Sequence, residues 1–370
     1  MENTETLEYF GATTFLLRTA GLTIFHDTWL NRPSLLPQFR SLDEITEADY
    51  ILISHAHFDH LPGADVIAKR TGAIIIANCE AINRLRDAGV PDTQLLPVSG
   101  GERIPLFTRE IRLAAAAADV AGAEGTHTIP LRQGGPPTAP PEPHHKLAAA
   151  EVHIWPSLHC LLPGSHDALP DVFNTGLPYE GEVTPFDGTP DVTRGMKYGL
   201  FKLRELVPEQ AIAVDPKMRC FVDWLEDRSP EGRNVMSACD GGQLMYHVLK
   251  PGAGAGSGAG VWKGGILFNA HLGAYEGIVK GIHPQPSIVV QGIAGRANLN
   301  GRPFNGSAAA FAVGLMRWLG EPEKVVWCLH DECLVKPYMV DTTAATAAVE
   351  LETRSHVVDL VPGGCYHLTQ

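Results

Sequence analysis

The sequence of this 370-residue chain predicts a layered α/β fold built from two halves. Strand–loop–helix–strand–helix alternation runs through residues 51–89, and the same logic returns in the last third of the chain. Between a predicted strand and a predicted helix stands a dense cluster of His and Asp side chains. We therefore expect one large domain, residues 1–370, with insertions at about 122–150 and 161–204.

The first third is expected to begin with short strands joined by turns and to continue with alternating helices and strands. A proline suits the first turn of the first helix, and Gly72 and Gly89 suit the two helix C-termini. The predicted strands cover residues 7–10, 13–18, 22–26, 51–54 and 73–77, and the predicted helices cover 62–71 and 79–88.

Two long Gly- and Pro-rich stretches, 122–143 and 161–190, are expected to be loops. The second stretch closely follows His159, a strand-end histidine where a site residue is expected. We therefore expect this loop to form a lid over the active site. A helix over 193–206 should follow it. In the last third we expect strands at 244–249, 265–268, 287–290 and 324–329, a helix at 307–319, and a glycine-rich hairpin tip at 251–260 between the first two strands.

Composition and charge favour a soluble protein that acts on a small molecule. The hydrophobic fraction is 44%, the charged fraction is 19%, and the formal charge is −13. This charge disfavours nucleic acid as a partner. No signal peptide and no apolar run of the ~20 residues that a membrane helix needs are recognisable. Seven scattered cysteines suggest a reducing, cytoplasmic setting. A homo-oligomer is compatible with the sequence, although nothing in it marks an interface.

The most informative segment is His55-Ala56-His57-Phe58-Asp59-His60, which places four metal-binding side chains in six residues. Alternate residues of an extended segment point the same way, so His55 and His57 can converge on one ion. Asp59 and His60, at the turn into the helix, can address a second. The alternative, a set of unrelated surface or core histidines, is much less probable at this spacing.

This cluster cannot complete two ion shells, so further ligands are expected at strand ends elsewhere. His159, His271 and His330 each follow an apolar run where a strand opens into a loop. Layered α/β folds place their sites at such positions. The alternative for each is a buried histidine whose hydrogen bonds are satisfied.

On these residues, and on the strand end at 23–27, the chain resembles the metallo-β-lactamase-fold hydrolases. Within these hydrolases, the chain is similar to the branch containing L-ascorbate-6-phosphate lactonase and N-acylphosphatidylethanolamine-hydrolysing phospholipase D. The resemblance implies a four-layer αββα sandwich with the metals at one edge, between the two sheets.

The resemblance implies a specific ligand set. His55, His57 and His159 would surround the first ion, and Asp59, His60 and His330 the second. His271 stands where family members usually have an aspartate that bridges both ions. A neutral imidazole offers one lone pair, so the site would be asymmetric or mononuclear. Asp240 is the alternative carboxylate.

Nitrogen-rich ligation suits Zn²⁺ best, with one or two ions and Mn²⁺ or Fe as substitutes. We expect hydrolysis by metal-bound hydroxide, with Asp59 and His271 as catalytic residues and Asp59 holding the hydroxide. Asp27 and Asp331 are expected to orient ligand histidines. The alternative for both is a solvated strand-end charge.

The sequence indicates the chemical class of the substrate less directly than it indicates the metal ligands. Tyr198, Arg194, Arg296 and Asn298 are candidate substrate-binding residues, and lid packing or an exposed helix face is the alternative reading. We expect a lactone or another cyclic ester or amide as substrate. A phosphodiesterase is the second hypothesis, and a degenerate member that binds a metal or ligand without hydrolysis is the third.

Overall fold

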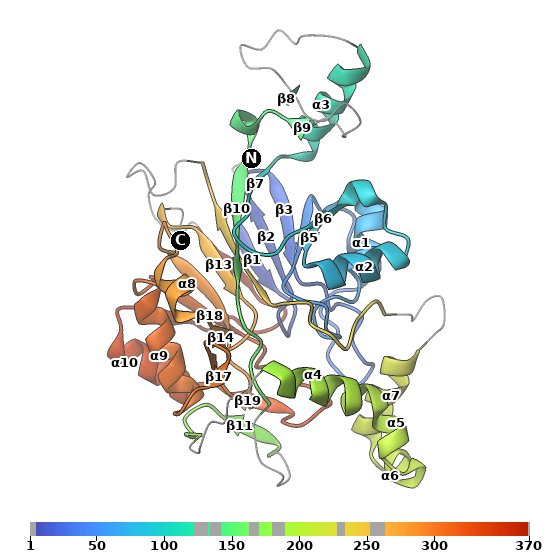
Figure 1. Ribbon diagram of the computed structural model, residues 1–370, viewed down its shortest axis with the longest axis vertical. Coiled ribbons are helices and arrows are strands. Elements are labelled where there is room, and N and C mark those ends of the chain that lie inside the picture. Colours follow the sequence, from blue (N-terminus) through green and yellow to red (C-terminus); the bar gives the residue numbers. More distant parts are fainter. Residues whose placement is uncertain are drawn as a thin grey trace.

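Two seven-stranded mixed sheets pack face to face and carry helices on their outer faces (Figure 1), as a computed structural model of the chain shows. The structure describes residues 5–121, 132–133, 142–162, 170–179, 189–227, 234–251 and 263–368. The four-layer αββα arrangement that the resemblance implies is confirmed.

The first sheet has the strand order β21-β1-β2-β3-β4-β5-β6. Neighbours are antiparallel from β21 to β3 and parallel from β3 to β6. Its strands are β1 (Thr6–Tyr9), β2 (Phe15–Thr19), β3 (Leu22–His26), β4 (Tyr50–Ile53), β5 (Ile74–Ala77), β6 (Leu95–Pro97) and β21 (Cys365–His367).

The second sheet has the order β20-β18-β15-β13-β12-β10-β7. Its neighbours are parallel from β20 to β13 and antiparallel from β13 to β7. Its strands are β7 (Arg103–Leu106), β10 (Ala150–Pro156), β12 (Leu244–Leu249), β13 (Ile266–Asn269), β15 (Ile288–Gly292), β18 (Lys324–Cys328) and β20 (His356–Val358).

Three apolar layers hold these sheets and helices together. The central layer, between the sheets, contains inward-facing side chains of both, such as Phe15 and Phe268. The helices α1 (Ala64–Thr71) and α2 (Cys79–Asp87) cover the first sheet through a second layer. The helices α8 (Glu276–Lys280), α9 (Ala308–Trp318) and α10 (Thr343–Glu352) cover the other sheet through a third. Because both faces of each sheet are covered, strands such as β4 are apolar at every position.

A group of short helices packs beside the strand ends and forms one wall of the site. They are α4 (Thr189–Tyr198), the 3₁₀ turn at Leu200–Lys202, α5 (Leu203–Leu206), α6 (Glu209–Val214) and α7 (Pro216–Glu226). Side chains of this group share an apolar cluster with Trp29 and Phe58. Figure 1 shows these helices together at one end of the molecule.

The predicted helix over 193–206 is thus interrupted at Gly199, and helical structure begins earlier than expected. The glycine-rich tip lies outside the described residues from 252 onward, as do large parts of both predicted insertions. The remaining elements are α3 (Arg109–Ala121), β8 (Arg132–Gln133), β9 (Glu142–Pro143), β11 (Val172–Asn174), β14 (Gly273–Ala274), β16 (Asn298–Leu299), β17 (Arg302–Pro303), β19 (Met339–Asp341) and 3₁₀ turns at Leu42–Glu44, Asp92–Gln94 and His145–Leu147.

Within the described ranges, no helix has both the length and the apolar character required to cross a bilayer.

Candidate metal centre

The loop that carries His55, His57 and His60, here called the signature loop, is held by backbone hydrogen bonds to residues 237–244. It leaves β4 at Ile53 and runs beside the segment that leads into β12. Ala56 N donates to Asp240 O at 3.1 Å, and Ser237 N donates to Ala56 O at 2.8 Å. Leu244 N donates to Ser54 O at 2.9 Å. The loop is therefore fixed between the two sheets rather than free in solvent.

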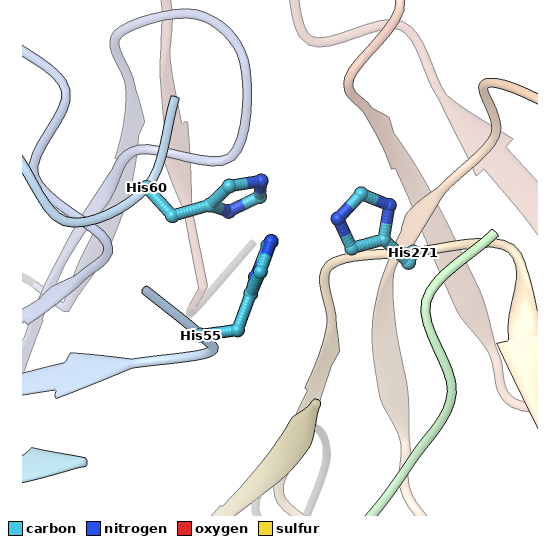
Figure 2. A group of neighbouring side chains, drawn as sticks. All are labelled: His55, His60 and His271. Carbon is cyan, nitrogen blue, oxygen red and sulfur yellow. The ribbon is translucent and has the colours of Figure 1, made fainter. Parts of the chain in front are cut away.

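Five histidines from both halves of the chain converge at this loop. His55, His57 and His159 form one group whose ligand atoms lie within 4.8 Å of one another. His55, His60 and His271 form a second such group, and Figure 2 shows His271 facing the other two from the opposite side. The rings of His159 and His271 stack with centroids 3.7 Å apart. The structure thus brings together the ligand set expected for the first ion.

The nitrogens of these rings suit a divalent cation. The Nε2 atoms of His55 and His271 are buried and have no hydrogen-bonding partner among the described residues. His57 Nδ1 and His159 Nε2 lie 3.1 Å apart. Burial and the neighbouring histidines lower the pKa of His55, His57 and His271 well below 6.5. Neutral imidazoles with free lone pairs facing one another are the state that metal ligation requires.

His60 is oriented by a buried carboxylate, as expected for Asp27. Asp27 Oδ2 lies 2.8 Å from His60 Nδ1 and accepts hydrogen bonds from the hydroxyls of Thr13 at 2.7 Å and Ser54 at 2.8 Å. The Nε2 atom of His60 lies 3.3 Å from Asp59 Oδ2. Burial alone would lower the pKa of His60, but the carboxylates of Asp59 and Asp27 outweigh it and raise this pKa to about 9. Binding of a cation at His60 would therefore displace a proton.

His330 is placed apart from this arrangement. Its ring stacks on Tyr9 with centroids 5.9 Å apart, and none of the His, Cys, Asp and Glu groups with metal-binding spacing in the described ranges contains it. It follows Leu329, whose φ of +59° turns the chain, and Leu329 N donates to Ala12 O. Asp331 accepts from Ala12 N at 2.7 Å and pairs with Arg32 at 2.7 Å. Among the described residues, the hydrogen bonds of Asp331 therefore run to Ala12, Arg32 and Tyr9 rather than to a histidine.

A cavity of about 430 Å³ opens beside the metal centre and is mainly apolar. His57, Asp59, His159 and His271 belong to its lining. Its walls come from the signature loop, the short helices, β19 and the segments after β3, β10, β15 and β18. The lining residues of these walls include Trp29, Phe58, Leu161, Leu162, Gly195, Met196, Leu200, Leu203, Val335 and Val340. Lys336 is the cationic side chain among its lining residues.

None of the four predicted substrate-binding residues belongs to this lining. Tyr198 is 54% exposed, and the Arg194 guanidinium lies 5.8 Å from its ring centroid, on the outer side of α4. Arg296 lies over the Tyr179 ring at 5.5 Å. Asn298 is buried and donates from Nδ2 to His159 O at 2.9 Å, so it supports a candidate ligand instead.

Three residues that contact the site were not predicted from the sequence. Thr13 and Ser54 hydrogen-bond Asp27 and the His60 ring, and Cys160 places its Sγ 3.3 Å from His271 Nδ1. The only sequence signal was adjacency, because Ser54 precedes His55 and Cys160 follows His159. Thr13 carried no signal at all.

Comparisons with known proteins support the fold. The model of the "Beta-lactamase superfamily domain" matches residues 21–149, about a third of the chain. A "UPF0173 metal-dependent hydrolase" of Anaeromyxobacter sp. (strain K) is 40% identical over 87 residues, which are 23% of this chain and 31% of that protein. One from Pyrobaculum islandicum is 33% identical over 100 residues, or 27% and 44% of the two chains. The matches thus span less than half of each relative's length.

Among solved structures, a metallo hydrolase of Ignicoccus hospitalis, Igni18, superposes with a TM-score of 0.48 at 17% identity and covers 98% of this chain and 97% of its own. An isothiocyanate hydrolase from Delia radicum gut bacteria gives 0.44 at 10% identity, with 98% and 99% covered. The strand order, the helical outer layers and the match at residues 21–149 together establish that this chain has the metallo-β-lactamase fold.

Proposed function

We propose that this chain is a metal-dependent hydrolase of a small, largely apolar molecule, with a lactone or another cyclic ester or amide as the favoured substrate. The observation that carries the proposal is the convergence of five histidines and Asp59, of which His57, His159, His271 and Asp59 also line an apolar cavity. Relatives named as metal-dependent hydrolases match 87 and 100 residues of the chain, and the family model matches residues 21–149, which include His55 to His60. We further propose that the activity needs no partner other than its small-molecule substrate.

The residues assign clear roles to the two sides of the centre. His55, His57 and His159 would hold one ion, and His60, His271 and Asp59 a second or a weaker one. A divalent ion bound there would supply Lewis acidity and would make water a usable nucleophile near neutral pH. Asp59, at the cavity wall, is placed to accept a proton from the attacking water. Zn²⁺ is the ion that this nitrogen-rich set favours, with Mn²⁺ and Fe as substitutes.

The cavity favours an apolar substrate over a phosphodiester. Acidic side chains at its wall, Asp59, Asp331 and Glu332, outnumber the single cation Lys336, whose ammonium pairs with Asp171 at 2.7 Å. Phosphate binding would call for several Lys or Arg donors. A leucine- and methionine-lined wall instead suits an alkyl or ring-bearing group next to the scissile bond. We also propose a cytosolic location, because the chain has seven cysteines, an odd number, scattered along its length, as is usual for reduced thiols.

Metal analysis followed by a substrate panel tests the proposal. Protein purified without added metal should contain at least one ion per chain, and His57→Ala should lose it. Fewer than about 0.3 ions per chain, without gain on zinc titration, would contradict any metal-dependent activity. Hydrolysis of bis-p-nitrophenyl phosphate but of no lactone, ester or amide would favour the phosphodiesterase. A loaded protein that turns over no member of the panel would point to the degenerate member.

A further inference from the structure

We propose that Cys160 is a positioning residue that orients both histidines contributed to the metal centre by the second sheet and its loops, His159 and His271. The inference rests on the proposed function, since it concerns how the same centre presents its ligands. It assigns one task to the backbone carbonyl of Cys160 and another to its sulfur.

The carbonyl fixes His159. The Nδ1 atom of His159 lies 2.7 Å from Cys160 O, and a carbonyl can only accept, so Nδ1 carries the hydrogen. A neutral imidazole then has its lone pair on Nε2. That atom lies 3.1 Å from His57 Nδ1, on the side where the first ion would bind. The residue after the ligand thus selects the tautomer that ligation needs.

The sulfur fixes His271 in the same sense. Cys160 Sγ lies 3.3 Å from His271 Nδ1, and the sulfur of a cysteine can accept a weak hydrogen bond. When His271 Nδ1–H donates to it, the lone pair of Nε2 remains free. The Nε2 atom of His271 is buried and, like that of His55, has no hydrogen-bonding partner among the described residues. His271 faces His55 and His60 (Figure 2). The opposite tautomer would place the hydrogen on Nε2 and block ligation.

The cysteine is itself held in place by the loop after β15. Leu161 N donates to Arg296 O at 2.8 Å, and Arg296 N donates to Leu161 O at 2.9 Å. Gly295 has a φ of +82°, and a Cβ there would lie 2.8 Å from Cys160 Sγ, so only glycine leaves room for the sulfur. Asn298 holds His159 O at 2.9 Å. The residues on either side of the cysteine, His159 and Leu161, are therefore held in place, which an orienting residue requires.

Direct ligation by the sulfur is the competing arrangement. Cys160, His159 and His271 also form a group with ligand atoms within 4.8 Å. In that arrangement the two Nδ1 atoms would bind the ion, yet His159 Nδ1 is engaged with Cys160 O. The free nitrogens lie instead on the opposite edges of the rings, toward the signature loop. This geometry favours orientation over ligation.

The first test measures the tautomer of His271 by long-range ¹H–¹⁵N NMR of ¹⁵N-histidine-labelled, metal-free protein. The wild type should carry the hydrogen on Nδ1, and Cys160→Ala should move it wholly or partly to Nε2, while Cys160→Ser should retain the wild-type form. Cys328→Ala, which removes an equally buried thiol from the core between the sheets, should change nothing. An unchanged tautomer in Cys160→Ala would overturn the proposal. Should that variant not fold, Cys160→Val carries the same expectation.

The second test is a cobalt titration followed by absorption spectroscopy. Cys160→Ala should bind the ion that His271 holds about 10- to 100-fold more weakly, the usual effect of removing an orienting group, with partial recovery in Cys160→Ser. A sulfur-to-cobalt charge-transfer band in the wild type, lost in Cys160→Ala and kept in Cys328→Ala, would show direct ligation and overturn the proposal. A wild type that binds no cobalt would refute the proposed function, and the tautomer measurement would still decide the role of Cys160.

Discussion

The guanidinium of Arg32 and the carboxylate of Asp331 form a buried ion pair that joins the two halves of the chain at the rim of the cavity. Arg32 Nη2 lies 2.7 Å from Asp331 Oδ2 and also donates to Glu332 O, while the guanidinium lies 4.8 Å from the Trp29 ring centroid. The other oxygen of Asp331 accepts from Ala12 N. The pair therefore fixes the loop after β18, which lines the cavity.

Arg32→Met is expected to lower the free energy of unfolding by about 3 kcal/mol, because it leaves the Asp331 carboxylate buried without its partner. Urea denaturation of the protein measures this loss. Arg204→Met, which removes an exposed arginine with several acidic neighbours, is the control and should lower the free energy of unfolding much less than Arg32→Met does. Similar losses in both variants would mean that the Arg32–Asp331 pair contributes no more to the free energy of unfolding than exposed ion pairs do.

The two histidines that follow β13 and β18 should differ in their effect on metal binding. His271 belongs to two groups of converging ligand atoms, and His330 to none of them. His271→Ala should therefore lose about one bound ion or weaken it by at least 10-fold, whereas His330→Ala should keep the wild-type metal content. Elemental analysis after gel filtration measures both. Loss of metal in His330→Ala alone would restore the ligand set that the family resemblance implies.

The sequence could predict the elements whose signals are local. The strands β3 and β12 have the expected bounds, and the helix expected over 307–319 begins at its cap, Ser307. α7 was missed although Asp215 and Pro216 form a recognisable start, in which the Asp215 carboxylate accepts from two backbone amides.

In the candidate site, too, the features with local signals could be predicted and the long-range contacts could not. The spacing from His55 to His60 was sufficient to predict converging ligands, because it depends on one strand and one turn. The contacts of Thr13 with His60 and of Cys160 with His271 join residues 47 and 111 positions apart. Such contacts depend on how the two sheets pack, for which no pattern within a segment gives a signal. The four predicted substrate-binding residues lie outside the cavity lining for this reason too, since helix α4 presents Gly195 and Met196 to the cavity rather than Arg194.

Asp27→Asn should weaken metal binding at His60 by about 10- to 100-fold without unfolding the protein. The carboxylate accepts hydrogen bonds from Thr13, Ser54 and the His60 ring, and an amide loses the charge and one acceptor. Asn also tolerates the φ of +51° at this position, so the backbone should persist. Isothermal titration with zinc measures the affinity, and circular dichroism checks the fold. An unchanged affinity would show that Asp27 acts only in folding.

The buried His247 should make the metal-free protein sensitive to acid. Its Nε2 donates to Gly264 O at 2.6 Å, and burial lowers its pKa to about 4 despite that bond. Because the folded-state pKa lies below the unfolded value of about 6.5, the contribution to stability is complete above pH 6.5 and is lost as the pH falls toward 4. The loss is at most about 3 kcal/mol, from 1.36 kcal/mol per pKa unit.

Urea unfolding of the metal-free wild type and His247→Gln at pH 7, 5.5 and 4.5 isolates this contribution, since the other buried histidines are common to both proteins. The wild type should lose more stability than the variant over this interval. A parallel pH dependence of the two proteins would contradict the role of His247.

The wall of the cavity at α4 should set the size of the substrate group that it accepts. A Cβ at Gly195 would lie 2.6 Å from Leu162 Cδ1, at the end of a flexible and partly exposed side chain, so a larger residue can be accommodated by displacing Leu162 across the cavity. Gly195→Val should therefore lower kcat/KM for esters or lactones with long alkyl groups by about 10-fold, which corresponds to the loss of one or two buried methylenes. Short-chain substrates should be affected much less. Lys197→Val, on the exposed side of the same helix, places an equally branched side chain outside the cavity and should leave the chain-length profile unchanged. A uniform loss across all chain lengths in Gly195→Val would indicate a disturbed metal centre rather than a narrowed cavity.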